Sequence, residues 1–335
     1  MVSVYAVAHL FVDFACAFLM FRYIAKSPDW YTCLLIYNFC AFAMQMPIGV
    51  IADKWNRNFL FAAVGCTLVG AAFALGNVPL AATVIAGIGN GMFHVGGGID
   101  ILNISENKCG ALGVFVSPGA FGIYLGTILG KGSSFPVGTV LLALLMAVVF
   151  IFAIHWASGE KGSGNAEFIL DGGASPHILI AACCMFLVVV LRSFVGLTLD
   201  FPWKSTGYWG AAAVCAAVFG KTAGGFIADR FGVSKTAMIS LGLTAVLFLI
   251  PEIPAAGILS LLLFNMTMPI TLWALSKTLP NAKGFSFGLL TFALFLGFLP
   301  VHLMLDSAFQ APWLFTIAAV VSLILLRIGL RKAVL

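Results

Sequence analysis

The sequence predicts an all-α integral membrane protein, with twelve transmembrane helices arranged as two six-helix parallel repeats. Composition is the first reason: of 335 residues, 62% are hydrophobic and 9% are charged, against about 25% charged in soluble domains. The second is that the apolar residues fall into runs of the ~20 residues that a membrane-spanning helix requires. The third is a charged phrase that occurs twice, as GVIADKW at 49–55 and GFIADRF at 225–231.

The apolar runs follow one another along the whole chain. They lie at residues 2–25, 31–52, 58–76, 79–99, 110–130, 136–157, 177–199, 206–224, 236–253, 255–275, 284–304 and 310–330. The first six predict an N-terminal six-helix bundle at 1–157, and the last six predict a C-terminal bundle at 176–335. Segment 158–175 is rich in glycine and polar residues, which is typical of a linker.

The basic residues indicate the orientation of the helices. With a cytoplasmic N-terminus, most lysines and arginines fall in the cytoplasmic loops and tail, as the positive-inside rule requires. We therefore expect both termini and the linker 158–175 to be cytoplasmic, in a bacterial cytoplasmic membrane. The net charge of +5 then follows from topology, so no nucleic-acid partner is expected.

The repeated phrase indicates an internal duplication. Asp53 and Asp229 occupy the same place in the two copies and lie half a chain apart. Further pairs keep nearly the same spacing in the same order: Asn90 with Asn265, Gly113 with Gly288, and Gly122 with Gly297. A duplicated six-helix unit is the parallel-repeat plan of many secondary transporters.

The first copy, GVIADKWNRN, resembles the G-x-x-x-D-[RK]-x-G-R-[RK] signature that members of the major facilitator superfamily carry between helices 2 and 3. The matching positions are Gly49, Asp53, Lys54 and Arg57, whereas Asn56 replaces the usual glycine and Asn58 the usual basic residue. The second copy keeps Gly225, Asp229 and Arg230. The resemblance covers the whole chain and implies a secondary transporter of two halves that open alternately to the two sides of the membrane.

Two shorter stretches resemble subgroups of this superfamily. AHLFVDFACAFL in the first run and GIGNGMFHVGGG in the fourth are similar to the fosmidomycin-resistance type, although Val95 stands where that group has proline. GVFVSPGAFGIYLG in the fifth run resembles the glycine-proline motif of antiporters. Its residues are Ser117, Pro118, Gly119 and Gly122. Both resemblances imply export.

The repeated phrase has the chemistry of a gate. Gly49 and Gly225 permit close helix approach, and Asp53 and Asp229 can accept hydrogen bonds from a facing helix N-terminus, which the helix dipole favours. Such contacts would latch the cytoplasmic side in the outward-facing state. The alternative is that these charges, Lys54 and Arg230 above all, only set the topology of the loops.

Charged groups inside the runs are the best candidates for function, because each costs about 2.5–3.5 kcal/mol at the centre of a membrane helix. Tyr5, His9 and Asp13 follow at i, i+4 and i+8, so they share one face of the first helix. We expect Asp13 with His9 to exchange protons. A static hydrogen-bonded network that only packs the first helix is the alternative.

Further polar residues complete the predicted cavity. Asn90 and His94 also lie at i and i+4, in a glycine-rich fourth helix, and Asn265 and Thr267 stand near Pro269 in the tenth. A histidine in such a position can equally be satisfied by a neighbouring carbonyl group.

Arg192, in the seventh run, leaves two interpretations open. It can bind an anionic group, or it can extend towards the outer surface and pair with Asp200.

These observations predict a secondary active transporter that moves a small, partly apolar solute by rocker-switch alternating access, with proton-coupled export. The predicted partners are a small-molecule substrate, a coupling proton and membrane lipids, and we expect a monomer without cofactor or bound metal. Two alternatives are a non-transporting receptor or assembly factor with this fold, and ion-coupled uptake of a metabolite. We expect no enzyme, since the histidines are scattered over separate helices and no G-K-[ST] phosphate loop is present.

Overall fold

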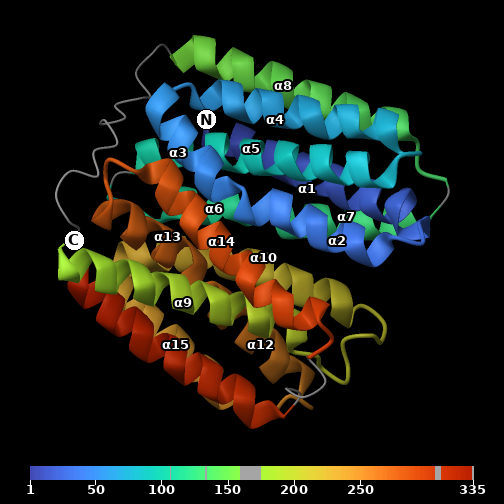
Figure 1. The fold of residues 1–335 in the computed structure, drawn as a ribbon. Coiled ribbons are helices and arrows are strands. Elements are labelled where there is room, and N and C mark those ends of the chain that lie inside the picture. The colour runs from blue at the N-terminus through green and yellow to red at the C-terminus, as the bar shows by residue number, and fades with distance from the viewer. Residues whose placement is uncertain (106, 133, 159–174, 306–310, 334–335) are drawn as a thin grey trace. The chain divides into compact units, whose positions relative to one another are not determined.

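The computed structural model describes residues 1–105, 107–132, 134–158, 175–305 and 311–333. Within these residues every regular element is a helix (Figure 1), and eleven helical segments are long and apolar enough to cross a membrane. A shorter apolar helix, α11 (Val233–Leu247), adds to them. The predicted all-α membrane fold is therefore confirmed, while nearly all of the expected linker 158–175 lies outside the described residues.

Contacts between residues divide the chain into two compact units, and each is described by itself. Unit 1 consists of 1–106, 118–168 and 281–292, and unit 2 consists of 107–117, 169–280 and 293–335. Most of unit 1 thus comes from the first half of the sequence and most of unit 2 from the second half. The short segments 107–117 and 281–292 pack with the opposite half.

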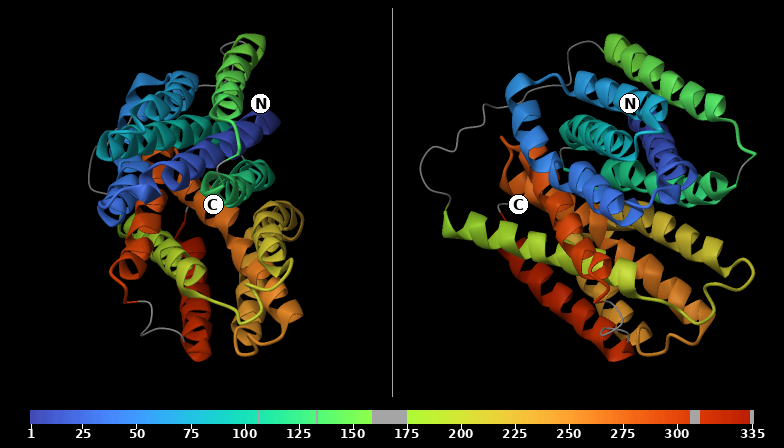
Figure 2. Two further views of the ribbon diagram at one scale, coloured as in Figure 1. Left: turned by 90° about the vertical axis from the view of Figure 1, so that its right-hand side faces the viewer. Right: turned by 45° about the vertical axis from the view of Figure 1, so that its right-hand side comes forward.

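Unit 1 is built from α1 to α5, α7, α8 and the beginning of α14. The bounds are α1 (Val2–Arg22), α2 (Trp30–Asn38), α3 (Gln45–Trp55), α4 (Asn58–Ala72), α5 (Pro79–Ser105), α7 (Pro118–Lys131), α8 (Val137–Ser158) and α14 (Lys283–His302), with the short helices η1 (Ile24–Lys26), η2 (Phe39–Ala43) and η3 (Phe73–Leu75). Helix α1 packs along α7, and α4 contacts both α5 and α8 (Figures 1 and 2). The fully buried Phe18 and Leu19 of α1 lie in this core.

Unit 2 is built from α6, α9 to α13, α15 and the end of α14. The bounds are α6 (Gly110–Val116), α9 (Pro176–Thr198), α10 (Trp209–Phe231), α12 (Pro254–Asn265), α13 (Thr267–Thr278) and α15 (Pro312–Lys332). Helix α9 lies along α15, and α10 packs on α12 and α6 (Figure 1).

The fifth and the tenth are among the predicted membrane helices that are interrupted close to a proline. The fifth is divided into α6 and α7 at Ser117, directly before Pro118, and the tenth into α12 and α13 at Met266, three residues before Pro269. Proline has no N–H to donate to the preceding turn, and its ring clashes with that turn. Irregular backbone at membrane depth is tolerated only where it is buried in protein or lines a cavity.

The residues that follow the two copies of the repeated phrase both have a positive φ. Asn56 ends α3 with φ 50° and ψ 42°, in the left-handed region, whereas Gly232 ends α10 with φ 95° and ψ 140°. Glycine is the usual residue at a helix end with positive φ, and asparagine is a side chain that tolerates the left-handed region. The departure from the signature at Asn56 is therefore compatible with the turn that the signature requires.

Equivalent glycines in the two halves make equivalent contacts. A Cβ atom at Gly113 would meet backbone atoms of Lys221 and Thr222 on α10, and one at Gly288 would meet backbone atoms of Gln45 and Met46 on α3. Gly288 lies 175 residues after Gly113, and Gln45 lies 176 residues before Lys221. These contacts are consistent with the predicted two-repeat arrangement.

Helices α1 and α7 approach closely because α7 carries glycine at every fourth position. Added Cβ atoms at Gly122 and Gly126 would collide with the backbone of α1 at Leu10 and Phe14. Small residues at this spacing let membrane helices pack backbone against backbone. This packing holds the face of α1 that carries His9 and Asp13 against its neighbours.

The α1–α7 contact predicts that Gly126→Ala lowers the stability of the purified protein by about 1–3 kcal/mol, because an added methyl group overpacks the contact. The matched control is Gly138→Ala in α8, where a Cβ would meet nothing within 4 Å. Because alanine loses less conformational entropy on folding than glycine, that variant should be as stable as the wild type or slightly more stable. Thermal unfolding in detergent measures both, and equal melting temperatures for the two variants would contradict the packing described.

Candidate functional site

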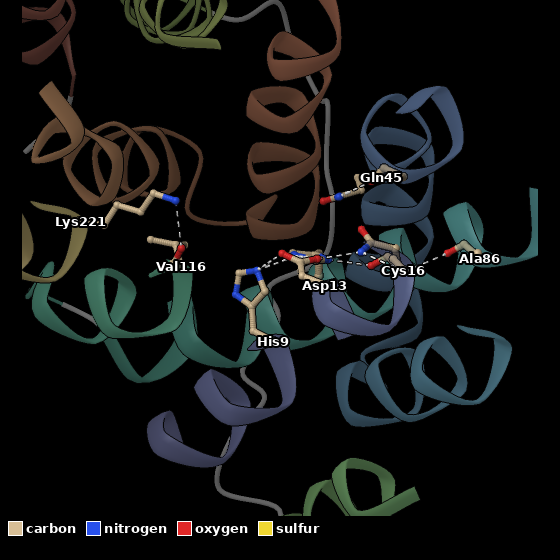
Figure 3. A network of polar contacts seen from close by, with 10 residues as sticks. His9, Asp13, Cys16, Gln45, Ala86, Val116 and Lys221 are labelled. Atoms are coloured by element: carbon tan, nitrogen blue, oxygen red, sulfur yellow. Dashed lines mark hydrogen bonds and ion pairs between the residues drawn. The ribbon is translucent and has the colours of Figure 1, made fainter. Parts of the chain in front are cut away.

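Helix α1 places a histidine and an aspartate one turn apart inside a membrane-spanning segment. His9 Nε2 lies 3.1 Å from Asp13 Oδ2, and both residues belong to the span Val2–Lys26. Figure 3 shows His9 directed towards Asp13 along the same helix. The i, i+4 spacing predicted that the two would share a face, and the structure shows them in direct contact.

Helix α5 brings two further polar side chains to the same place. Asn90 Nδ2 donates to Asp13 Oδ1 over 2.9 Å, and His94 Nε2 lies 2.8 Å from His9 Nε2 and 3.7 Å from Asp13 Oδ1. We call His9, Asp13, Asn90 and His94 the His–Asp cluster. Its members lie on two helices and come from positions up to 85 residues apart.

The hydrogen bonds of the cluster define which nitrogen atoms carry protons. His94 Nδ1 lies 2.8 Å from the carbonyl oxygen of Asn90, which can only accept, so this nitrogen donates. In neutral His94 the Nε2 atom is then an acceptor, and the proton between the rings belongs to Nε2 of His9. That proton also faces Asp13 Oδ2. A single proton therefore joins two imidazoles and a carboxylate.

The cluster is shielded from solvent. His9 is 5% exposed, Asn90 2% and His94 9%, and the side chain of Asp13 is 12% exposed. On the third side, a Cβ atom at Gly119 of α7 would collide with His9 Nε2 and Asp13 Oδ2. Gly119, one of the four residues of the predicted glycine-proline motif, thus leaves room for the cluster.

The same atoms form a grouping that can hold a metal ion. His9, Asp13 and His94 each offer one ligand atom, and these atoms lie within 4.8 Å of one another. Two imidazoles and a carboxylate suit zinc and its neighbours among the transition metals. The sequence did not indicate this grouping, because its members lie on separate helices. In the structure His9 forms hydrogen bonds with Asp13 and His94, and His94 Nε2 lies 3.7 Å from Asp13 Oδ1.

Tyr5 makes a contact apart from the cluster. Its hydroxyl donates to Asp100 Oδ2 of α5 over 2.6 Å. Asp100 was missed in the sequence because the fourth run was expected to end at residue 99, whereas α5 continues to Ser105. An acidic residue at the edge of an apolar run was the available signal.

Asp53 binds the N-terminus of α14. Its Oδ1 accepts from the backbone N–H of Gly284 over 2.7 Å and its Oδ2 from that of Phe285 over 2.9 Å. A Cβ atom at Gly49 would collide with the backbone of Gly284, so glycine is needed at this point of contact. Asp53 is 4% exposed, and its carboxylate satisfies two N–H groups that have no partner within their own helix.

Asp229 makes the corresponding contact with the start of the fifth membrane helix. Its Oδ1 accepts from the N–H of Cys109 over 2.5 Å and its Oδ2 from that of Gly110 over 2.9 Å. Here Gly225 packs against Cys109 and Gly110. Unlike Asp53, Asp229 is exposed. Each copy of the repeated phrase thus binds one helix N-terminus through two consecutive amides.

The basic residues of the repeated phrase lie outside these contacts. Lys54, Arg57 and Arg230 are all exposed. Near the α14 N-terminus a different lysine, Lys283, donates to Asn103 Oδ1 over 2.8 Å.

The polar residues of the tenth membrane helix bond chiefly within that helix. Asn265 Nδ2 donates to the carbonyl of Leu261, and Thr267 Oγ1 donates to that of Phe264. Thr271 Oγ1 additionally accepts from Arg192 Nη1 over 3.3 Å. The suggested pair of Arg192 with Asp200 is not formed among the described residues. Arg192 instead contacts Thr271 of α13, in the same unit.

The break at Ser117 is linked to α10. Ser117 Oγ lies 2.7 Å from Thr222 Oγ1. Lys221 Nζ donates to the carbonyl of Val116 over 3.5 Å, as Figure 3 shows. Pro118 cannot donate a backbone hydrogen bond to the turn before it. Side chains of α10 therefore stabilise the interrupted helix on one side of the proline.

Comparison of the whole structure with known proteins defines its fold. An MFS transporter structure, FucP in the outward conformation, matches with a TM-score of 0.69 and 14% identity over 98% of each chain. The Escherichia coli fucose:proton symporter FucP matches at 0.68 and 13% over 99% of each chain, and the human organic anion transporter MFSD10 at 0.67 and 15% over 98% of each. No family model and no curated protein matches the sequence.

The chain therefore has the fold of the major facilitator superfamily, as the repeated phrase implied. At 13–15% identity these structures establish the fold and leave the substrate to the residues of this chain.

The contact of Asp229 predicts the reactivity of Cys109. This thiol is 1% exposed, and burial together with the neighbouring Asp229 carboxylate raises its pKa. Because the thiolate is the reactive form, labelling with N-ethylmaleimide at pH 7 should be slow. Asp229→Ala removes the acceptor of the Cys109 N–H and should accelerate labelling severalfold.

Mass spectrometry of the labelled peptides measures this rate. Cys66, which is 0% exposed and lies in unit 1, is the internal control and should remain unlabelled in both proteins. An unchanged rate at Cys109 in Asp229→Ala would show that the carboxylate does not hold this helix end.

Proposed function

We propose that the protein is a secondary active transporter that moves a small, partly apolar solute by rocker-switch alternating access and couples this movement to protons. The His–Asp cluster is the observation that carries the proposal. Ionisable side chains inside membrane spans are costly and mark ion or substrate pathways. Here three of them converge with Asn90 in the interior of a fold used by transporters.

The cluster supports a specific route for the coupling proton. Asp13 accepts hydrogen bonds from Asn90 and His9, which suits an ionised carboxylate. When the shared proton moves to His94 Nε2 and His9 takes up a further proton at its Nδ1, the His94 imidazolium formed would have Asp13 Oδ1 at 3.7 Å as its counter-charge. The transported proton is then shared by the two imidazoles, while Asp13 stabilises the charged state.

The two aspartate contacts support a gate at the cytoplasmic side. Each joins the last turn of a helix in one half of the sequence to a helix start of the other half, Asp53 to Gly284 and Asp229 to Cys109. If the two six-helix halves move apart on that side, both contacts must break. Two carboxylates at helix N-termini would therefore stabilise the outward-facing state. We further propose that both termini are cytoplasmic, that the membrane is bacterial and cytoplasmic, and that the protein is a monomer.

Export and uptake are supported by different observations. The glycine-proline stretch around Pro118 resembles that of antiporters and favours export. The likeness to a fucose:proton symporter favours ion-coupled uptake as the second candidate. Both use the same cluster, and the sign of the proton gradient that drives accumulation distinguishes them.

The proton route predicts that Asp13→Asn abolishes coupled transport and leaves the protein folded. The amide keeps the shape of the side chain but removes the counter-charge for the imidazolium. Ligands are first identified by thermal unfolding of the wild type at pH 6 and pH 8 with a metabolite and drug library, since a compound that binds the folded state raises the melting temperature. A hit is then followed in liposomes under imposed pH gradients.

The matched control is Asp29→Asn, which removes an exposed carboxylate before α2 in the same unit. It should transport like the wild type. Transport by Asp13→Asn at the wild-type rate with unchanged pH dependence would contradict the proton route. A wild-type protein that binds ligands but moves none of them under any gradient would favour the receptor alternative.

A further inference from the structure

Arg192 is a buried cation whose charge no carboxylate neutralises in the described part of the chain. It belongs to α9 inside the span Pro176–Thr198 and is 9% exposed. Its one hydrogen bond among the described residues runs from Nη1 to Thr271 Oγ1, at 3.3 Å. A guanidinium group carries five N–H donors, so most of its donors are left for another partner.

Because Arg192 lies inside a membrane-spanning helix, a guanidinium without a counter-charge is unfavourable in the ligand-free protein. Six residues separate it from the end of α9 at Thr198, about 9 Å along the helix axis. Ser193, the next residue, donates to the carbonyl of Leu294 over 2.7 Å, and Gly297 of α14 packs against Val190 and Ser193. These contacts fix the rotation of α9, so Arg192 is held towards α13.

The backbone beside Arg192 provides a second, independent observation. The tenth membrane helix is interrupted at Met266, and Pro269 has no N–H to donate to the carbonyl of Asn265 one turn earlier. Thr271, the partner of Arg192, lies two residues beyond this proline. Interrupted helices near the middle of the membrane form the substrate sites of many secondary transporters.

We infer that Arg192 binds an oxyanion, a carboxylate or a phosphate or phosphonate group, carried by the solute. The planar guanidinium binds two oxygen atoms of such a group at once. Thr271, whose Oγ1 donates to the carbonyl of Met268 over 2.9 Å and accepts from Arg192 Nη1, positions the guanidinium. The inference names the substrate class of the proposed transporter. Binding of the oxyanion stands without the proposed function, whereas transport of the solute rests on it. The solute is then an amphipathic anion, with an apolar part and one oxyanion.

A first test needs no knowledge of the ligand. Arg192→Met replaces the cation by an apolar side chain of similar length, and should raise the melting temperature of the ligand-free protein, because an unpaired buried charge is lost. Arg327→Met, which changes an exposed arginine of α15 in the same unit, is the matched control and should leave the melting temperature unchanged. If Arg192→Met lowers it below that of the control, Arg192 stabilises the fold, and the inference is overturned.

A second test measures binding with defined probes. Benzoate and phenylphosphonate are compared with the neutral benzamide by calorimetry in a maltoside detergent, which contains no phosphate. The anions should bind the wild type and Arg327→Met, and Arg192→Met should weaken the better anion by about 10- to 100-fold, the range for hydrogen bonds to a charged group. Equal affinity for anions and benzamide, or equal affinity of wild type and Arg192→Met, would overturn the inference.

The same assay separates the sources of the oxyanion and the two proposals. Binding of dihexanoyl phosphatidic acid through Arg192, with no binding of phenylphosphonate, would assign the oxyanion to a lipid and overturn its assignment to the solute. Anion binding through Arg192 without movement of the anion in liposomes contradicts the proposed transport and leaves the binding site. Transport of a neutral solute that Arg192→Met does not affect contradicts the anion as substrate and leaves the transporter.

Discussion

The cost of a charge in an apolar environment is the constraint on which the structure of this protein depends. A chain with 9% charged residues has few charged groups, and those inside the helices need partners from the protein. Asp13 receives hydrogen bonds from Asn90 and His9, and Asp53 receives two from backbone amides. Arg192 differs, because its single described partner is a neutral hydroxyl. The partners of these charges differ, and this difference distinguishes the proposed proton site, gate and anion site.

The sequence duplication places an equivalent aspartate in each half, and both carboxylates accept hydrogen bonds from two backbone amides. Gly284 lies 175 residues after Cys109, so both carboxylates accept from the same position in their respective repeats. The symmetry is incomplete, because Asp53 is buried and Asp229 is exposed. Water weakens the electrostatic part of a contact, so the contact of the buried Asp53 is the less weakened of the two. The ionisable residues His9, Asp13, His94 and Arg192 have no such duplication, which suits two halves with different tasks.

Much of the fold was predictable from the sequence because it follows from local rules. Apolar runs of membrane length gave the helices, and spacing of four residues placed His9 with Asp13 and Asn90 with His94. The contact between His9 and His94 was not predictable, because it depends on how α1 and α5 pack. Gly119 and Asp100 were missed for related reasons: the first acts through the space it leaves, and the second lies in a helix that extends beyond the predicted end. The sequence left the partner of Arg192 open, because the length of the side chain alone allows both interpretations. Packing of α9 on α13 and α14 places the side chain against Thr271 and not against Asp200.

The central claim is that a single proton joins Nε2 of His9 to Nε2 of His94 beside the carboxylate of Asp13. Nitrogen NMR of the protein with ¹⁵N-labelled histidine tests it directly, because a hydrogen bond between two ring nitrogens gives a scalar coupling between them. Assignments come from His9→Gln and His94→Gln. The account predicts this coupling between the two Nε2 atoms in the wild type, with Nδ1 of His94 protonated, and a weaker coupling in Asp13→Asn. A wild-type protein whose two Nε2 atoms show no coupling would contradict it.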